Sequence, residues 1–413
     1  MKIAFFVGLP MASRPAALGS LVALAAQALF AVFLLRGFAA EAVGTFAVIS
    51  QVAFFWATLA LSQSPVSLLA QRSQPPALAA RQAWQASMVR WLCLSPLMLI
   101  GLWWSALGSA DQALLRTACV WLVLMSGCQL SWQLAQSLVL RTRSDAALAW
   151  VRMTPALLGV LVAALAWMVL PQPGAVLLLA SATLGFAVGA LWLLPAWTRN
   201  DGLAQVVRDN RSFCADPTAD LRPLWLRSLH TFSDVGVVTL VAVSWQALHG
   251  NAAAGHLLLL LRLTGFVPAL VHSAWSQVAL ARTVEGTGAA QRAAALACLL
   301  LTLIGGAVAL ADVTGQIGPG WQGLRHLLWP VLAWQMGATL LATLAHRPFQ
   351  CQRASTWSWS NIALNALMAL LVLWPIGPTQ LHLQWLGYGA AAGHLLLWLW
   401  LLRLPGTAGR SQA

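Results

Sequence analysis

A single arginine stands inside one of the most apolar stretches of the chain. Arg262 follows five leucines, Leu257 to Leu261, and precedes Leu263. An arginine at the centre of a membrane helix costs about 2.5–3.5 kcal/mol on insertion scales, so its guanidinium should face water or a partner. Two interpretations stay open: a cation lining the path of an anionic substrate, or a structural arginine that pairs with Asp234 or caps backbone carbonyls.

Asp234 is the one carboxylate inside a predicted membrane span. His230 lies four residues before it, on the same face of a helix. A carboxylate beside an imidazole can bind a cation or relay a proton. The pair also lies only one or two turns from the end of the span, where water alone could solvate it. We take Asp234 and His230 as candidates for ion or proton coupling.

Neutral polar side chains form stripes on two other apolar segments. The spacing of three or four residues puts each stripe on one helix face, and lipid would penalise either one. Hydrogen bonds between helices and a shared aqueous cavity both explain such stripes. Asn361 and Asn365 share a face of a further segment. The stripes are Ser126, Gln129, Gln133 and Gln136 in the first half, and Gln335, Thr339, Thr343 and His346 in the second.

Twelve apolar segments must position these groups. The sequence is 60% hydrophobic and 8% charged, and its mean hydropathy is +0.76. A soluble protein of this composition could not cover its own surface, so lipid must solvate much of the chain. About 20 helical residues cross a hydrocarbon core. That length predicts an all-α membrane protein with spans near 16–35, 43–63, 91–108, 117–139, 152–170, 175–196, 228–248, 254–274, 293–311, 327–345, 356–375 and 383–402.

Basic residues fix the orientation of these spans. The formal net charge is +13, yet Lys and Arg are distributed between apolar runs and form no basic cluster of the kind that binds nucleic acid. With the N-terminus inside, only Arg36, Arg116 and Arg325 fall in external loops, and nearly all others fall in cytoplasmic ones. This bias predicts that both termini are cytoplasmic. Met1 and Met11 are both candidate start residues.

A polar segment divides the chain in the middle. Arg199 to Arg222 contains four aspartates and follows six predicted spans. We therefore expect an N-terminal six-helix bundle at 1–198, a cytoplasmic linker at 199–222 and a C-terminal six-helix bundle at 223–413. The halves also resemble each other: the junction at 35–44 and the junction at 248–255 are both short, alanine-rich and closed by glycine.

No pattern of catalytic residues stands out. The sequence has no phosphate-binding glycine loop with a lysine, no H-E-x-x-H and no G-x-S-x-G. The six cysteines follow no paired spacing, which argues against a disulfide framework or a metal site. We expect no cofactor, no metal and no enzymatic activity. The short external loops leave little room for a membrane-embedded polymerase or transferase.

Three patches resemble bacterial polysaccharide (O-antigen type) flippases, within the multidrug/oligosaccharidyl-lipid/polysaccharide exporter superfamily. The segment Phe33 to Ala47 resembles their junction of spans 1 and 2, with a basic residue, an acidic turn and then glycine. Ala254-Gly255-His256 followed by Arg262-Leu263 resembles their junction of spans 7 and 8, although His256 replaces a more usual tyrosine. Asn361 and Asn365, followed by 387–391, resemble their last two spans.

The resemblance implies two six-helix bundles that form a V around a cationic cavity, with alternating access. Its implied substrate is a polyprenyl-diphosphate-linked oligosaccharide, moved from the cytoplasmic to the outer leaflet of the bacterial inner membrane for lipopolysaccharide O-antigen or similar surface polysaccharide biosynthesis. Arg262 and Arg36 would neutralise the diphosphate, and Gln129, Gln133, Gln335 and Asn365 would hydrogen-bond sugars. We expect a monomer in the lipid bilayer, alongside polysaccharide polymerase and chain-length proteins. The alternative is a multidrug or small-molecule exporter coupled to protons or sodium.

Overall fold

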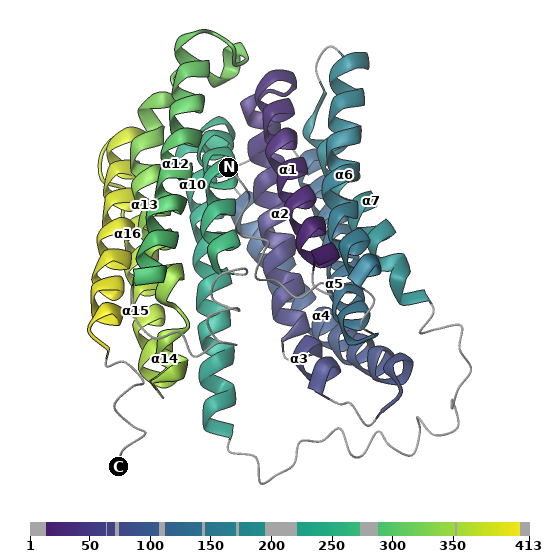
Figure 1. Cartoon of the computed structure of the whole chain (residues 1–413). Coiled ribbons are helices and arrows are strands. Elements are labelled where there is room, and N and C mark those ends of the chain that lie inside the picture. The colour runs from purple at the N-terminus through teal and green to yellow at the C-terminus, as the bar shows by residue number, and fades with distance from the viewer. Residues whose placement is uncertain are drawn as a thin grey trace. The chain divides into compact units, whose positions relative to one another are not determined.

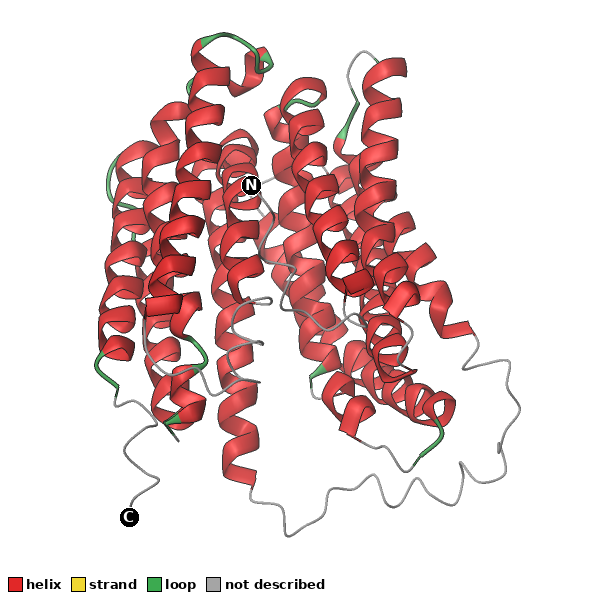
Figure 2. Ribbon diagram, viewed as in Figure 1, coloured by secondary structure: helices red, strands yellow, loops and turns green. Residues whose placement is uncertain are grey.

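The described part of the chain is built from helices (Figure 2), and no strand occurs in it. The computed structural model describes residues 14–62, 64–70, 74–106, 112–142, 145–170, 173–194, 221–272, 288–351 and 353–404. The α-helices are α1 (Arg14–Gly37), α2 (Ala40–Leu61), α3 (Ser64–Ala70), α4 (Pro76–Ala106), α5 (Gln112–Thr142), α6 (Asp145–Val169), α7 (Ala175–Ala190), α10 (Leu221–Leu270), α12 (Gly288–Val313), α13 (Arg325–Leu344), α14 (Arg347–Gln350), α15 (Ala354–Leu373) and α16 (Thr379–Leu402).

The helices confirm the predicted all-α membrane fold. Within the described residues, nine helices are long and apolar enough to cross a membrane. One of them, in α10, is 43 residues long and contains two predicted spans, because Gly250 breaks the helical geometry at φ 83° and ψ 174°. Helices α1 and α4 contain two further predicted spans. Each of the twelve predicted spans therefore falls on a helix in its described part, and the chain is a multi-pass membrane protein.

The chain forms two compact units. Unit 1 comprises Met1–Gly37 and Ile49–Asp220, and unit 2 comprises Phe38–Val48 and Leu221–Ala413. The units differ from the expected halves in the segment 38–48, which contains the first turns of α2 and packs with the C-terminal half. The expected linker at 199–222 lies almost wholly outside the described residues, so the predicted domain boundaries stay a prediction.

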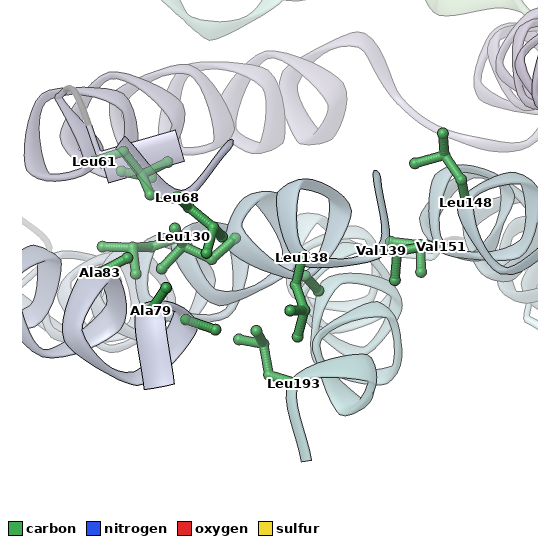
Figure 3. Close-up of a cluster of buried hydrophobic side chains, with 14 of the residues drawn as sticks. Leu61, Leu68, Ala79, Ala83, Leu130, Leu138, Val139, Leu148, Val151 and Leu193 are labelled. Atoms are coloured by element: carbon green, nitrogen blue, oxygen red, sulfur yellow. The ribbon is translucent and has the colours of Figure 1, made fainter. Parts of the chain in front are cut away.

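Unit 1 is organised around α5. Helices α4, α6 and α7 pack against α5, and α1 packs along α6 (Figure 1). A core of buried leucines, alanines and valines joins the end of α2 to α3, α4, α5 and α6 (Figure 3). Beside this core, the Trp56 ring stacks on the Trp91 ring with centroids 4.7 Å apart, and the Trp56 indole donates to the Trp91 carbonyl. Aromatic stacking adds to area burial in such a pair.

Two arginines of unit 1 cap helix ends. The Arg90 guanidinium donates to the carbonyls of Ala60 and Leu61 at the end of α2, and Arg141 donates to the carbonyl of Leu68 near the end of α3. The last carbonyls of a helix have no partner inside it and carry partial negative charge. These two basic residues therefore stabilise helix ends, in addition to any effect on membrane orientation.

Unit 2 is organised around α13, which packs against α10, α12 and α16, while α15 packs against α10 and α16. Helices α13 and α16 approach closely because glycines stand where they cross. A Cβ at Gly387 would lie 2.5 Å from the Pro330 carbonyl oxygen, and a Cβ at Gly337 would lie 3.0 Å from the Cβ of His394. Small residues at helix crossings are the usual means of close packing in membranes.

The segment 38–48 joins unit 2 through a glycine pair. A Cβ at Gly44 would overlap the Asn251 carbonyl oxygen, and a Cβ at Gly255 would overlap the Ala40 carbonyl oxygen. The Trp321 indole also donates to the Phe38 carbonyl at 2.9 Å. The two junctions that resemble each other in sequence, at 35–44 and 248–255, are thus in direct backbone contact.

Candidate functional site

A polar cluster links the first half of α10 (221–249) to α15. His230 Nε2 lies 3.2 Å from Asp234 Oδ2, and Asn365 Nδ2 donates to Asp234 Oδ1 at 2.7 Å. The same Asn365 amide donates to the Ser233 hydroxyl at 3.0 Å, which in turn donates to the His230 carbonyl at 2.8 Å. We call these four residues the Asp234 cluster. The structure thus brings together both coupling candidates and one of the predicted substrate-binding residues.

The Asp234 cluster has the chemistry of a cation or proton site. The Asp234 side chain is 50% exposed and that of His230 is 20% exposed. Each carboxylate oxygen of Asp234 has a polar partner, His230 on one side and Asn365 on the other. If the Asn365 amide turned over, Asp234, Ser233 and Asn365 would present three oxygens, the ligand type that hard cations prefer. A proton can instead bind at His230 or Asp234.

Arg262 lies on the second half of α10 (251–270) and is exposed at the surface of the described residues, while its neighbours Leu260 and Leu263 are buried. Its guanidinium carbon stands 5.8 Å from the centroid of the Phe46 ring, inside the range of a cation–π contact. Because the Asp234 carboxylate bonds to His230 and Asn365, the alternative of an Arg262–Asp234 pair is not observed.

Arg36, the second predicted diphosphate ligand, is exposed in the last turn of α1 and belongs to unit 1. It lies two residues before Phe38, whose carbonyl receives the Trp321 indole. Its position at a helix end agrees equally with an interfacial anchor.

Gln129 and Gln133 stand one turn apart on α5. Gln129 is buried and Gln133 half-buried, and within the described residues neither Gln129 Oε1 nor Gln133 Nε2 has a hydrogen-bond partner. The neighbouring hydroxyls are occupied: Trp91 donates to Ser126 at 2.9 Å and Trp84 to Ser131 at 3.1 Å. Buried polar atoms are rarely left without a partner. One acceptor and one donor in this arrangement suit water or a hydroxyl-bearing solute.

The stripe on α13 behaves differently. Gln335, Thr339, Thr343 and His346 are all buried. The hydroxyls of Thr339 and Thr343 donate to carbonyls of their own helix, at Gln335 and Leu340. Most of this stripe therefore lies in the core of unit 2, where helix packing accounts for it. Gln335 faces the second half of α10, because a Cβ at Gly265 would lie 3.7 Å from its Oε1, and Gly265 is three residues from Arg262.

Other polar contacts of unit 2 involve histidines. His256 Nε2 bonds to the Gly320 carbonyl at 3.0 Å, and the His256 ring packs on the Trp321 ring, so His256 is held by packing and by a backbone contact. His249 meets His382 across 133 residues of sequence. The only sequence signal near either pair is the similarity of the junctions at 35–44 and 248–255. Within the described residues, no group of three or more His, Cys, Asp or Glu could hold a metal ion.

The described helices define a multi-pass helical membrane protein. Solved structures support this class. The chain superposes on the lipid II flippase MurJ in an inward closed conformation with a TM-score of 0.68 and 10% identity, covering 94% of this chain and 86% of that one. An inward-facing MATE family multidrug resistance transporter superposes with a TM-score of 0.59 and 14% identity, covering 92% of this chain and 97% of that one. The MATE multidrug transporter DinF-BH superposes with a TM-score of 0.51 and 15% identity, covering 97% of each chain.

These neighbours are a lipid II flippase and multidrug transporters, and their likeness to this chain is one of fold. The resemblance seen in the sequence is thereby confirmed for the fold. No protein-family model matches the chain, and no curated protein matches it. At 10–15% identity the neighbours do not decide between a lipid flippase and a multidrug exporter.

Proposed function

We propose that the protein is a flippase that moves a polyprenyl-diphosphate-linked oligosaccharide from the cytoplasmic to the outer leaflet of a bacterial inner membrane, by alternating access, for surface polysaccharide biosynthesis. The observation that carries the proposal is Arg262, an exposed residue that follows five leucines within a membrane span. The protein acts as a transporter and not as an enzyme, and both termini are cytoplasmic.

The charge of Arg262 suits an anionic cargo. Inside-negative potential favours outward movement of negative charge by about 2.3 kcal/mol per charge per 100 mV, so a diphosphate leaves the cytoplasm down the electrical gradient. An exporter of cations would favour acidic groups along its path. Arg262, with Arg36 as a second candidate, neutralises the diphosphate while it crosses the apolar core.

The neutral amides suit the sugar part of that cargo. Gln129 and Gln133 offer one acceptor and one donor that the described part of the chain does not satisfy, and a sugar hydroxyl can bond to both kinds of atom. Gln335 and Asn365 are the corresponding candidates in unit 2. Gln335 is buried, so contact with a sugar would require the neighbouring part of α10 to move.

A deletion strain tests the proposed flippase. We expect the strain to accumulate the lipid-linked oligosaccharide in the cytoplasmic leaflet and to lose its surface glycan. The wild-type gene should restore the glycan, Arg262→Lys should restore most of it, and Arg262→Ala should restore little. Normal surface glycan in the deletion strain would overturn the proposal.

The Asp234 cluster supports the second candidate function, a multidrug or small-molecule exporter coupled to protons or sodium. In this function Asp234 and His230 exchange the coupling ion, and the same cluster could energise a flippase. Deletion should then raise drug susceptibility while surface glycan stays normal, and Asp234→Asn should fail to restore resistance. If deletion changes the glycan and not the susceptibility, the exporter is excluded.

A further inference from the structure

Two histidines from distant parts of the sequence meet at one end of unit 2. His249 is the last residue before the Gly250 kink of α10, and His382 lies in the first turn of α16. His249 Nε2 and His382 Nδ1 are 2.8 Å apart. The Thr379 hydroxyl lies 3.0 Å from His249 Nδ1, and His382 Nε2 lies 3.0 Å from the Leu371 carbonyl oxygen. The four groups form one continuous chain of hydrogen bonds.

The Leu371 carbonyl at one end of this hydrogen-bond chain fixes the direction in which each bond donates. A carbonyl oxygen only accepts, so His382 Nε2 must carry a proton and donate to Leu371. In the neutral ring His382 Nδ1 is then an acceptor, which requires His249 Nε2 to donate. His249 Nδ1 is left as an acceptor for the Thr379 hydroxyl. With both histidines neutral, every ring nitrogen of the pair has a matched partner.

The same chain of hydrogen bonds can accept one additional proton. If a proton binds at His249 Nδ1, that nitrogen becomes a donor, and the Thr379 hydroxyl can rotate to accept from it. The bond from His249 Nε2 to His382 Nδ1 is unchanged. A second proton would have to bind at His382 Nδ1, where it would oppose the donor of His249. It would also place two positive rings 5.1 Å apart, centroid to centroid.

Trp245 provides a suitable environment for that single charge. Its ring centroid lies 4.5 Å from that of His249 and 4.9 Å from that of His382. Trp245 is 1% exposed and His382 is 0% exposed, so both rings are fixed by packing. An indole face attracts a cation most strongly where water is excluded. Thr379 and His249 are half-buried, and they give the proton a route from solution.

We propose that His249 and His382 form a binding site for a single proton, entered through Thr379. The site is separate from the Asp234 cluster: fifteen residues of one helix separate His249 from Asp234, which is about 22 Å at 1.5 Å per residue. It joins the end of the first half of α10 to the start of α16, directly beside the Gly250 kink. Protonation therefore changes the charge at a joint between two membrane helices, whichever cargo the protein carries.

The other ionisable groups near this end of the described part of unit 2 have different contacts. The Asp312 carboxylate accepts from the backbone N–H groups of Gly323 and Arg325. The Arg325 guanidinium contacts His326. His256 bonds to Gly320. Glu41 is exposed at the start of α2, and the described residues of α15 contain no ionisable side chain.

Nitrogen NMR of the full-length protein tests the proposal. With ¹⁵N-labelled histidine in lipid nanodiscs, the signals of the pair are those lost in His249→Gln and His382→Gln. At high pH we expect both rings to carry the proton on Nε2. On acidification the pair should take up one proton in one step, and a second only at much lower pH. His326→Gln should leave this behaviour unchanged, because His326 is outside the hydrogen-bond chain.

Thr379 gives an independent test if the histidine variants fail to fold. Thr379→Val removes the hydroxyl that partners His249 Nδ1, so the tautomer of His249 should become mixed and the proton should bind differently. Thr379→Ser should restore the wild-type titration. The proposal is overturned if the high-pH tautomers are the opposite ones, if the two rings titrate independently, or if neither ring takes up a proton before the protein unfolds. None of these results depends on the cargo, so the proposed flippase function stands or fails separately.

Discussion

Unit 1 and unit 2 differ in the polar groups that their membrane helices carry. In unit 2, α10 carries charged groups: Asp234 is half-exposed and contacts His230 and Asn365, and Arg262 is exposed. In unit 1, α5 carries the neutral amides of Gln129 and Gln133, which keep polar atoms without a hydrogen-bond partner within the described residues. Arginines cap helix ends in both units, Arg90 in unit 1 and Arg347 in unit 2. Under the proposed function, unit 2 would therefore bind ions and charged groups, and unit 1 would bind neutral polar groups.

The largest expected effect comes from the exposed charge of unit 2. Arg262→Ala should reduce transport tenfold or more, since a hydrogen bond to a charged group is worth about 1.5–3 kcal/mol and about 1.4 kcal/mol corresponds to a factor of ten. Restoration of surface glycan in the deletion strain, normalised to protein level, measures it. Arg403→Ala, which removes an exposed arginine at the end of α16, is the control. Equal transport by the Arg262→Ala and Arg403→Ala variants would contradict a role of Arg262 in binding the cargo.

The next effect concerns the glycine pair that binds the segment 38–48 to unit 2. Gly255→Ala should destabilise the folded state by about 1–3 kcal/mol, as overpacking generally does, because its Cβ would overlap a backbone carbonyl. Gly306→Ala is the matched control, since a Cβ at Gly306 meets nothing within 4 Å. Thermal unfolding in detergent should show a lower midpoint for the first variant alone. An unchanged midpoint for Gly255→Ala would contradict the contact.

A smaller effect on stability is expected at the Asp234 cluster. Asp234→Asn keeps the size of the side chain and removes its charge, and exposed pairs contribute only about 0–1 kcal/mol. The unfolding midpoint should therefore hardly change, while the dependence of transport on protons or sodium should disappear. Asn365→Asp is the informative companion, because it adds a carboxylate beside Asp234 and should strengthen cation binding. If ion dependence survives in Asp234→Asn, coupling resides elsewhere.

The smallest effect on transport should come from the neutral amides of unit 1. The direction of the accompanying change in thermal stability is informative. Gln129→Leu and Gln133→Leu remove buried polar atoms that lack partners, whose desolvation costs about 1–3 kcal/mol each. We expect equal or higher thermal stability together with weaker transport of the sugar-bearing cargo. Thr339→Val on α13 should not raise the thermal stability, because the Thr339 hydroxyl already donates to the Gln335 carbonyl. Higher stability with full transport would show that the amides have no role in binding.

The sequence predicted the fold well because the bilayer imposes a simple length rule. Runs of about 20 apolar residues located all twelve spans on helices, and the multi-pass class followed from composition alone. The sequence also placed His230 and Asp234 together, because residues four apart share a helix face. It did not predict that Asn365 joins them, since that contact crosses 131 residues and depends on how α10 packs on α15.

Arg262 shows the same contrast between what local sequence determines and what contacts between helices determine. The sequence alone determined that a guanidinium lies inside an apolar membrane helix and needs water or a partner. The packing of the helices then shows that Asp234 contacts His230 and Asn365, that the Arg262 guanidinium lies near the Phe46 ring, and that Gly44 lies close to Gly255. The physical reason is range: hydrophobic periodicity and local spacing act within one helix, whereas the choice among partners depends on backbone approach between helices far apart in the chain.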